Sequence, residues 1–207
     1  MDLIRPIEAI VPGAQGRVLA VLVETTAELN LRTIAQLAGI SQAQTSRLLP
    51  ELVDLGVVER REVPPASLFR LVPEHIASRA LLSLARSTDG VLVEMGRLSR
   101  ALPRPPVSVI VFGSFARREA DARSDIDVVV VRPSEIDEDD DEWVNSLDGW
   151  RGAVRRLTGN PVEVLEVSVA DAARKLRGRS QVWADIRRDG HVVHGFDIAD
   201  LREARTG

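Results

Sequence analysis

Two aspartates separated by one residue, Asp125 and Asp127, stand where an apolar segment begins, in the run SDIDVVVV. Because side chains alternate between the two faces of a strand, we expect both carboxylates to point to the same face. Two such carboxylates repel each other unless a cation or a proton lies between them. Oxygen ligands arranged in this way suit Mg²⁺, which favours one or two carboxylates together with substrate phosphates. The pattern therefore predicts a magnesium site that acts on phosphates.

The segment before these aspartates contains residue types that accommodate phosphate. Gly113 and Ser114 directly follow another apolar segment, VSVIVF, which predicts a buried strand. A glycine lets the backbone approach a ligand closely, and a serine offers both a hydroxyl and an amide. Arg117, three residues after Ser114, is placed to add a positive charge. The turn after the first strand and the acids at the start of the second are therefore expected to form one site.

The stretch GSFARREADARSDIDVVVV resembles the polymerase-beta-type nucleotidyltransferase superfamily, and most closely its small prokaryotic members, the minimal nucleotidyltransferases. The resemblance implies transfer of a nucleoside monophosphate from a nucleoside triphosphate, which we expect to be ATP, to a hydroxyl, with pyrophosphate leaving. It also implies that Asp125 and Asp127 hold two Mg²⁺ ions, in the two-metal arrangement. The residues that it places on the nucleotide are Gly113, Ser114, Arg117 and Ser124.

The same family uses a third carboxylate on a neighbouring strand, which helps to deprotonate the attacking hydroxyl or completes the metal cage. The segment NPVEVLEVS offers Glu163 and Glu166, which face opposite sides of one strand because they are three residues apart. The resemblance favours Glu163 as catalytic residue and metal ligand, because the apolar-acid-apolar pattern around it matches the family's third-acid strand. The family usually has aspartate there, and glutamate is one methylene longer.

The first 72 residues show two helices joined by a tight turn and followed by a hairpin. Apolar residues recur at helical spacing in LRTIAQLAGI, Gly39 ends that helix, and Ser41 is a suitable N-cap for SQAQTSRLLPELVDLG. Two alternating segments, VVERREV and SLFRLV, flank a Pro-Pro turn and predict a two-stranded wing. Pro50 falls inside the second helix, which it is expected to kink or shorten.

This order of elements, over roughly residues 15–72, resembles the winged helix-turn-helix family, in which the second helix enters the DNA major groove and the wing touches the backbone. Winged helices also serve as dimerisation or docking modules, and residues 1–72 carry seven arginines against eight acids. We therefore expect modest DNA affinity that depends on a homodimer, with docking as the alternative. The resemblance implies Ser41, Gln42, Gln44, Thr45 and Arg47 as base-facing residues and Arg60, Arg61 and Arg70 as phosphate contacts.

The predicted fold class is α+β. It comprises a winged helix-turn-helix domain at 1–72, a helical connector at 73–106 that ends at PRPP, and a small mixed-sheet nucleotidyltransferase domain with flanking helices at 107–207. The chain has no cysteine, which excludes disulfides and thiol nucleophiles. Its longest apolar runs are far shorter than a membrane span, so we expect a cytoplasmic protein without a membrane partner.

The acceptor of the nucleotide is left open by the sequence. It could be a partner protein, as with minimal nucleotidyltransferases that act as antitoxins by modifying a paired toxin, or RNA, or a small molecule bound across a dimer interface. The alternative function is a transcription regulator whose nucleotidyltransferase domain only senses nucleotide or docks a partner. A regulator of the toxin-antitoxin type is one form of this alternative. The intact aspartate pair favours the enzyme, because a sensor could lose one acid without penalty.

Overall fold

The computed structural model describes Asp2 and residues 4–204. Its contacts divide the chain into two compact units, one formed by Arg5–Ser87 and the other built on the residues from Thr88 onward. Each unit has its own hydrophobic core. No helix among the described residues is long and apolar enough to cross a membrane.

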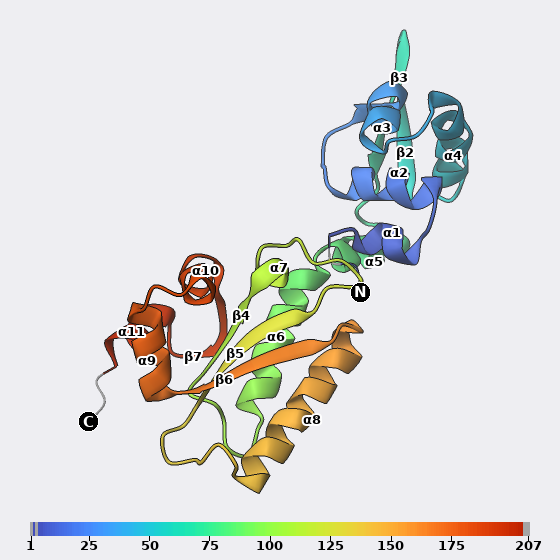
Figure 1. The fold of residues 1–207 in the computed structure, drawn as a ribbon. Helices are drawn as coiled ribbons and strands as arrows, with labels where there is room; N and C mark the ends of the chain where they lie inside the picture. Colours follow the sequence, from blue (N-terminus) through green and yellow to red (C-terminus); the bar gives the residue numbers. More distant parts are fainter. Residues whose placement is uncertain (1, 3, 205–207) are drawn as a thin grey trace. The chain divides into compact units, whose positions relative to one another are not determined.

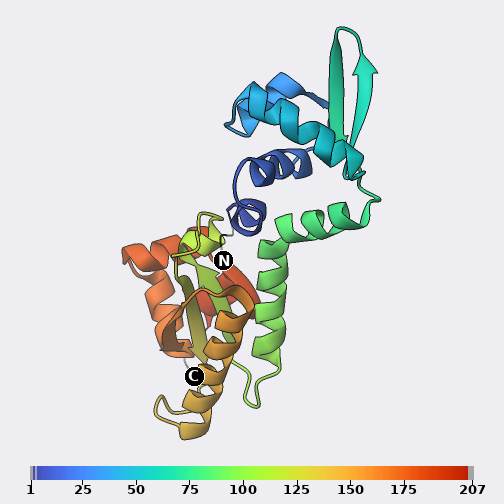
Figure 2. The same ribbon diagram turned by 90° about the vertical axis from the view of Figure 1, so that its right-hand side faces the viewer.

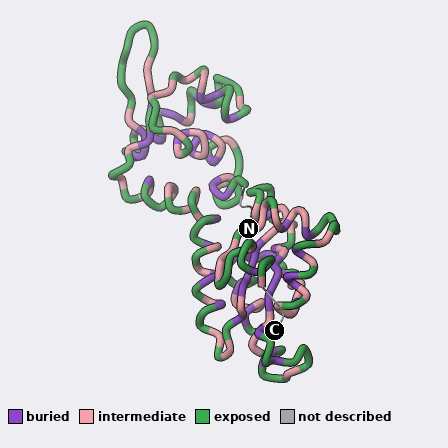
Figure 3. The backbone as a smooth tube through the Cα atoms, turned by 90° about the vertical axis from the view of Figure 1, so that its left-hand side faces the viewer, coloured by how far each residue is buried: buried purple, intermediate pink, exposed green. Residues whose placement is uncertain are grey.

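The N-terminal unit contains the predicted helix-turn-helix and wing (Figure 1). Its three-stranded sheet is antiparallel, in the order β1-β3-β2, and its two longer strands form a protruding hairpin (Figure 2). The hairpin is exposed from Arg60 to its tip (Figure 3). The elements are α1 (Pro6–Ile10), α2 (Ala14–Val23), β1 (Leu29–Asn30), α3 (Leu31–Leu37), α4 (Gln42–Asp54), β2 (Val58–Val63), β3 (Ala66–Leu71) and α5 (Ile76–Ala85).

Helix α4 is not shortened at Pro50, although shortening is one of the two effects that the sequence predicts. It continues past the proline for another turn, to Asp54. A proline inside a helix costs about 3 kcal/mol through the lost amide donor and a steric clash. Leu49 and Leu52, on either side of it, are buried in the core, and burying each side chain contributes about 1.5–3 kcal/mol. Packing of these two leucines therefore offsets the cost of the proline.

The C-terminal unit is built on a four-stranded sheet in the order β6-β5-β4-β7. Strands β5 and β6 run parallel to each other, whereas β4 is antiparallel to both of its neighbours. The mixed sheet with flanking helices confirms the predicted α+β class. The elements are α6 (Ser87–Arg100), β4 (Ser108–Phe112), α7 (Gly113–Ala116), β5 (Ile126–Arg132), α8 (Asp141–Thr158), β6 (Val162–Ser168), α9 (Val169–Arg177), α10 (Gln181–Asp189), β7 (His191–Gly195) and α11 (Ile198–Glu203).

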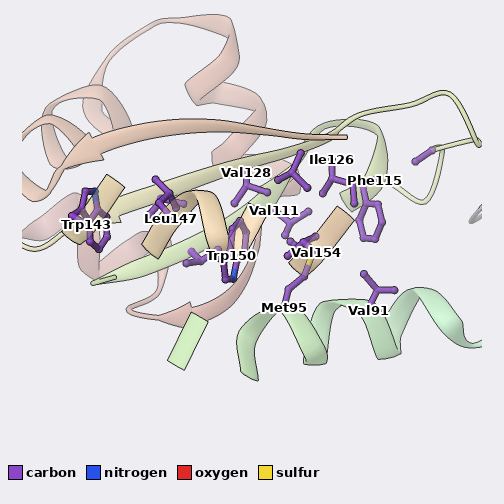
Figure 4. Close-up of a cluster of buried hydrophobic side chains, with 14 of the residues drawn as sticks. Val91, Met95, Val111, Phe115, Ile126, Val128, Trp143, Leu147, Trp150 and Val154 are labelled. Carbon is purple, nitrogen blue, oxygen red and sulfur yellow. The ribbon is translucent and has the colours of Figure 1, made fainter. Parts of the chain in front are cut away.

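Helices cover both faces of this sheet. On one face, α6 and α8 pack against alternate residues of the strands, such as Ile126 and Val128 of β5 (Figure 4). On the other, α9, α10 and α11 pack against the intervening residues, such as Val129 and Val131. The two central strands, β4 and β5, therefore read as nearly continuous apolar runs, because both of their faces are buried.

The boundary between the units lies at Ser87, inside the stretch 73–106 that the sequence predicts as a connector. Helix α5 packs into the N-terminal core through residues such as Leu81, whereas α6 contributes Val91 and Met95 to the C-terminal core. Each helix of this stretch therefore belongs to the unit beside it in the sequence.

Candidate functional site

Three carboxylates meet at the start of β5 and β6. Asp127 is the second residue of β5, and Glu163, the second residue of β6, is its direct partner in the parallel register. Asp127 alternates with the residues that face α6 and α8, so it points to the face covered by α9 and α10. Glu163 alternates with Val162 and Val164 in the same way and shares that face. Asp125 precedes the strand by one residue and is exposed.

Glu166 lies on the opposite face of β6 and makes structural contacts. Its Oε1 accepts a hydrogen bond from Nε of Arg132 at 2.7 Å and another from the indole Nε1 of Trp143 at 3.0 Å. Both donors come from the side of the sheet that α8 covers. The alternative candidate for the third acid is therefore held away from Asp127, whereas Glu163 lies beside it.

The carboxylates at this site perturb one another. Partial burial raises the pKa of Asp127, and the negative charges of Asp125 and Glu163 raise it further. The positive charge of Arg117 opposes the shift. A carboxylate that is partly desolvated next to like charges favours a proton or a cation nearby. A cation beside these carboxylates would therefore reduce their mutual repulsion.

Gly113 leaves room for the Asp127 carboxylate. Its φ is +71°, in the left-handed region that favours glycine. A Cβ built at this position would lie 2.3 Å from Oδ2 of Asp127, well inside van der Waals contact. Any larger residue would therefore push the carboxylate aside and strain the backbone at the same time.

The loop between β4 and β5 is held by its own polar groups. The Ser124 hydroxyl donates to Oδ1 of Asp121 at 3.0 Å and accepts from the Asp121 amide at the same distance. Arg117 lies 2.8 Å from a carboxylate oxygen of Glu119 and 3.8 Å from one of Asp189. Ser124 thus shapes the turn, and Arg117 is held by acids on both sides. Ser114, also predicted to hold the nucleotide, is partly buried. Its carbonyl oxygen accepts a hydrogen bond from the Glu119 amide.

Asn160 supports this loop, although no motif in the sequence points to it as a site residue. Its side chain is completely buried, and its Nδ2 donates to the carbonyl oxygens of Asp121 at 3.1 Å and Ser124 at 2.9 Å. One side chain before β6 therefore fixes the residues that lead into Asp125. In the sequence, the dipeptide Asn160-Pro161 indicates only a turn. No other signal shows that the Asn160 side chain bonds to the loop.

The donor set at this site fits Mg²⁺. Among the residues that the structure describes, no three acidic or histidine side chains enclose a ready-made metal cage. Mg²⁺ does not need one, since it usually binds through one or two carboxylates and completes its shell with water and phosphates. Asp125 and Asp127 supply carboxylate oxygens, and the space beside Gly113 admits the Asp127 carboxylate.

The exposed start of α4 carries most of the predicted base-facing residues, with one correction. Ser41 and Gln44 form a capping box, in which each side chain accepts a hydrogen bond from the other's backbone amide. Gln42 and Arg47 are exposed. Thr45 is completely buried, and its hydroxyl donates to the Ser41 carbonyl at 3.1 Å. It shares the inward face of the helix with Leu49, so it cannot reach a base.

The wing arginines are exposed, and each already has a carboxylate partner within the N-terminal unit. A phosphate would have to compete with these acids for the guanidinium groups. Exposed ion pairs contribute only about 0–1 kcal/mol, so such exchange is feasible at little cost. The pairs are Arg60 with Glu62, Arg61 with Glu28, and Arg70 with Glu59.

Two protein-family models match the chain. The nucleotidyltransferase domain model matches residues 96–180, and the IclR helix-turn-helix domain model matches residues 16–62. The chain therefore carries a helix-turn-helix domain joined to a nucleotidyltransferase domain, which confirms the combination predicted from its motifs.

Two solved structures are remotely similar to the chain. One, titled "Crystal structure of the toxin-antitoxin with AMP-PNP", is 16% identical, covers 55% of this chain and 77% of that chain, and has a TM-score of 0.35. The other is TrmBL2, an archaeal chromatin protein described as showing a novel mode of DNA binding. It is 13% identical, covers 90% of this chain and 74% of that one, and has a TM-score of 0.30. No curated protein sequence matches the chain.

Proposed function

We propose that the C-terminal unit is a Mg²⁺-dependent nucleotidyltransferase that moves a nucleoside monophosphate, AMP from ATP in the simplest case, onto a hydroxyl group. The observation that carries the proposal is the convergence of Asp125, Asp127 and Glu163 at the start of two neighbouring strands. Its second support is the match of this part of the chain to the nucleotidyltransferase domain. Burial raises the pKa of Asp127, repulsion by Asp125 and Glu163 raises it further, and a divalent cation would relieve that repulsion.

In the proposed reaction, the acceptor hydroxyl oxygen attacks the α-phosphorus of the triphosphate. A new P–O bond forms, and pyrophosphate leaves with the electrons of the broken P–O bond. Glu163 takes the proton of the hydroxyl. Asp125 and Asp127 would hold Mg²⁺, which when bound would neutralise charge on the triphosphate. Gly113 and Ser114 let the backbone approach the outer phosphates, and Arg117 adds positive charge there.

Incubation of the purified chain with α-labelled ATP and Mg²⁺ tests this proposal. We expect label to appear on the chain itself, on added RNA or on a co-purified partner protein such as a toxin. Asp125→Asn should abolish the labelling, because the cation loses a ligand. Glu166→Gln is the matched control on the same sheet, and it should keep the labelling because Glu166 faces away from the acids. Labelling that survives Asp125→Asn would contradict the proposed mechanism.

We propose DNA binding as the function of the N-terminal unit, because the helix-turn-helix model matches it and Gln42 and Arg47 are exposed on α4. The test is a mobility shift on the DNA upstream of the coding sequence. Arg47→Ala should weaken the shift, whereas Arg79→Ala, an exposed arginine on α5, should not. If ATP binds but no nucleotide is transferred, and if ATP changes the affinity for DNA, the protein is better described as a transcription regulator than as an enzyme.

A further inference from the structure

A pocket of about 570 Å³ lies within the N-terminal unit, between helix α4 and the wing formed by β2 and β3. The first residues of α3 also contribute to its lining. Pockets of about 300–1,000 Å³ are typical of small-molecule sites, so this one is large enough for a small organic ligand. The residues of its lining that matter most here are Arg32, Ser46, Leu49, Val53, Arg60 and Phe69.

The apolar part of the lining comes from the hydrophobic core of the unit. Leu49 and Phe69 are buried members of that core, and Val53 packs against it. All three side chains also border the pocket. A ligand with an apolar body would be removed from water by contact with them, which is favourable.

The register of the wing turns one of its arginines toward the pocket. Arg60 lies directly opposite Phe69 in the antiparallel pairing, so their side chains share a face of the sheet. Ser67 lies on this face too, and its hydroxyl accepts a hydrogen bond from Nε of Arg60 at 3.0 Å. Arg61 and Arg70 alternate with these residues and lie on the opposite face. Arg60 is therefore the wing arginine that lines the pocket.

The lining also carries a positive charge without a partner. Arg32, in the first turn of α3, is exposed, and its guanidinium makes no ion pair within the described part of the chain. Among the described residues, the lining holds one acid, Asp54, against the two arginines. A guanidinium group without a carboxylate partner suits a carboxylate ligand, which it can hold through two parallel hydrogen bonds.

We propose that this pocket binds a small carboxylic acid with an apolar body, with the carboxylate on Arg32 and the body against Leu49, Val53 and Phe69. A phosphate of DNA would satisfy the arginine but would leave the apolar side chains uncovered. An uncharged apolar molecule would cover these side chains but would leave Arg32 without a partner. The acid satisfies both parts of the lining.

The bound acid competes with DNA in this proposal. Gln42 and Arg60 line the pocket and are also among the residues that we expect to contact DNA. An acid that occupies the space between α4 and the wing would keep these two side chains from the DNA. The competition rests on the proposed DNA binding, whereas the binding of the acid does not.

Isothermal titration calorimetry of the full chain without DNA tests the binding with a matched pair of probes, naphthalene-2-carboxylate and its uncharged amide. The acid should bind about tenfold more tightly than the amide, because it gains the charge-assisted contact with Arg32. Arg32→Gln should remove this preference. Arg79→Gln should keep it, because Arg79 is an exposed arginine of α5 outside the lining.

A second pair of variants distinguishes the pocket from the rest of the surface of α4. Ser46→Trp fills the pocket from its lining and should weaken the binding of both probes by about tenfold. Ala43→Trp, outside the lining, should change either affinity by less than about twofold. Both positions are exposed, so neither substitution disturbs the core.

Competition is measured by the fluorescence anisotropy of a labelled duplex of the DNA upstream of the coding sequence. At about ten times its dissociation constant, the acid should weaken the apparent affinity for DNA about tenfold. The amide at the same concentration should weaken it much less. Affinity for DNA that stays unchanged while the acid is bound would overturn the competition.

Equal affinities of the acid and the amide for the wild-type protein would overturn the assignment of the pocket. So would an Arg32→Gln variant that retains the preference for the acid, or equal binding to the two tryptophan variants. Absence of DNA binding together with intact binding of the acid would refute the proposed function of the N-terminal unit and leave the assignment of the pocket standing.

Discussion

Replacing Asp127 by asparagine should stabilise the protein while removing its response to magnesium. The asparagine keeps the shape that fits against Gly113 but deletes one of three neighbouring negative charges. Like charges about 4 Å apart repel by about 1 kcal/mol in water and by more at a half-buried site. After solvent screening and the opposing attraction of Arg117, a net gain of about 1 kcal/mol remains. This corresponds to a rise of roughly 3–6 °C in the melting temperature of a domain of this size.

The assay is thermal unfolding in EDTA and in Mg²⁺ with an ATP analogue whose α,β-bridge resists cleavage. The wild-type protein should gain about 2.7 kcal/mol when the ligand is at a hundred times its dissociation constant. Asp127→Asn should start from a higher melting temperature and gain almost nothing. Glu166→Gln should do the reverse, starting lower because it breaks the contact with Arg132 and keeping the full gain.

The pH dependence gives the same test a second readout. The folded state raises the pKa of Asp127 above the unfolded value, so the metal-free folded state holds this proton more tightly. This tighter binding of the proton contributes to the stability of the folded state. The contribution is present below the unfolded pKa, near 3.8, and is lost as the pH rises through the folded pKa. Asp127→Asn removes this loss. A variant that is no more stable than wild type in EDTA, or that responds fully to magnesium, would contradict this prediction.

Further predictions concern the supports of the site and the DNA interface. Gly113→Ala should lower the free energy of unfolding by about 1–3 kcal/mol and abolish the magnesium response, measured by urea unfolding and thermal shift, because its Cβ meets the Asp127 carboxylate. Asn160→Ala should lower the free energy of unfolding, measured with urea, by about 2–3 kcal/mol, because two loop carbonyls lose their donor. A change below about 0.5 kcal/mol would contradict this role of Asn160. The slope of log affinity for DNA against log salt should become shallower by about 1 in Arg60→Ala, and an unchanged slope would exclude a phosphate contact by Arg60.

The pairing of the acids could be predicted only in part from the sequence. The spacing of Asp125 and Asp127 predicts that they share a face, because strand periodicity is local, and in the structure Asp125 lies one residue before β5. The sequence shows that Glu163 and Glu166 face opposite sides, but it does not show which side carries the aspartates. That depends on the register of β5 against β6, which is a long-range property. Only the family resemblance distinguished the two glutamates before the structure.

Two features of the N-terminal unit show the same difference between local properties, which the sequence reveals, and long-range ones, which it does not. The inward position of Thr45 was available in the sequence, because Thr45, Leu49 and Leu52 recur at helical spacing. Its polar side chain favoured the wrong interpretation. The ion pair between Arg61 and Glu28, by contrast, depends on the approach of a segment 33 residues earlier in the chain. No local pattern predicts it.

The order of the strands in the C-terminal sheet has a consequence for how proteins can approach the acids. Strand β6 is an edge of its sheet, and an edge strand exposes main-chain groups on which another chain can pair. Arg151 of α8 donates hydrogen bonds to the Val162 carbonyl, a main-chain acceptor at the end of this edge that carries Glu163. A polypeptide that extended the sheet there would first have to displace the arginine. The Arg151 side chain therefore disfavours strand addition and aggregation at this edge. Partner proteins are expected to bind through loops or side chains instead.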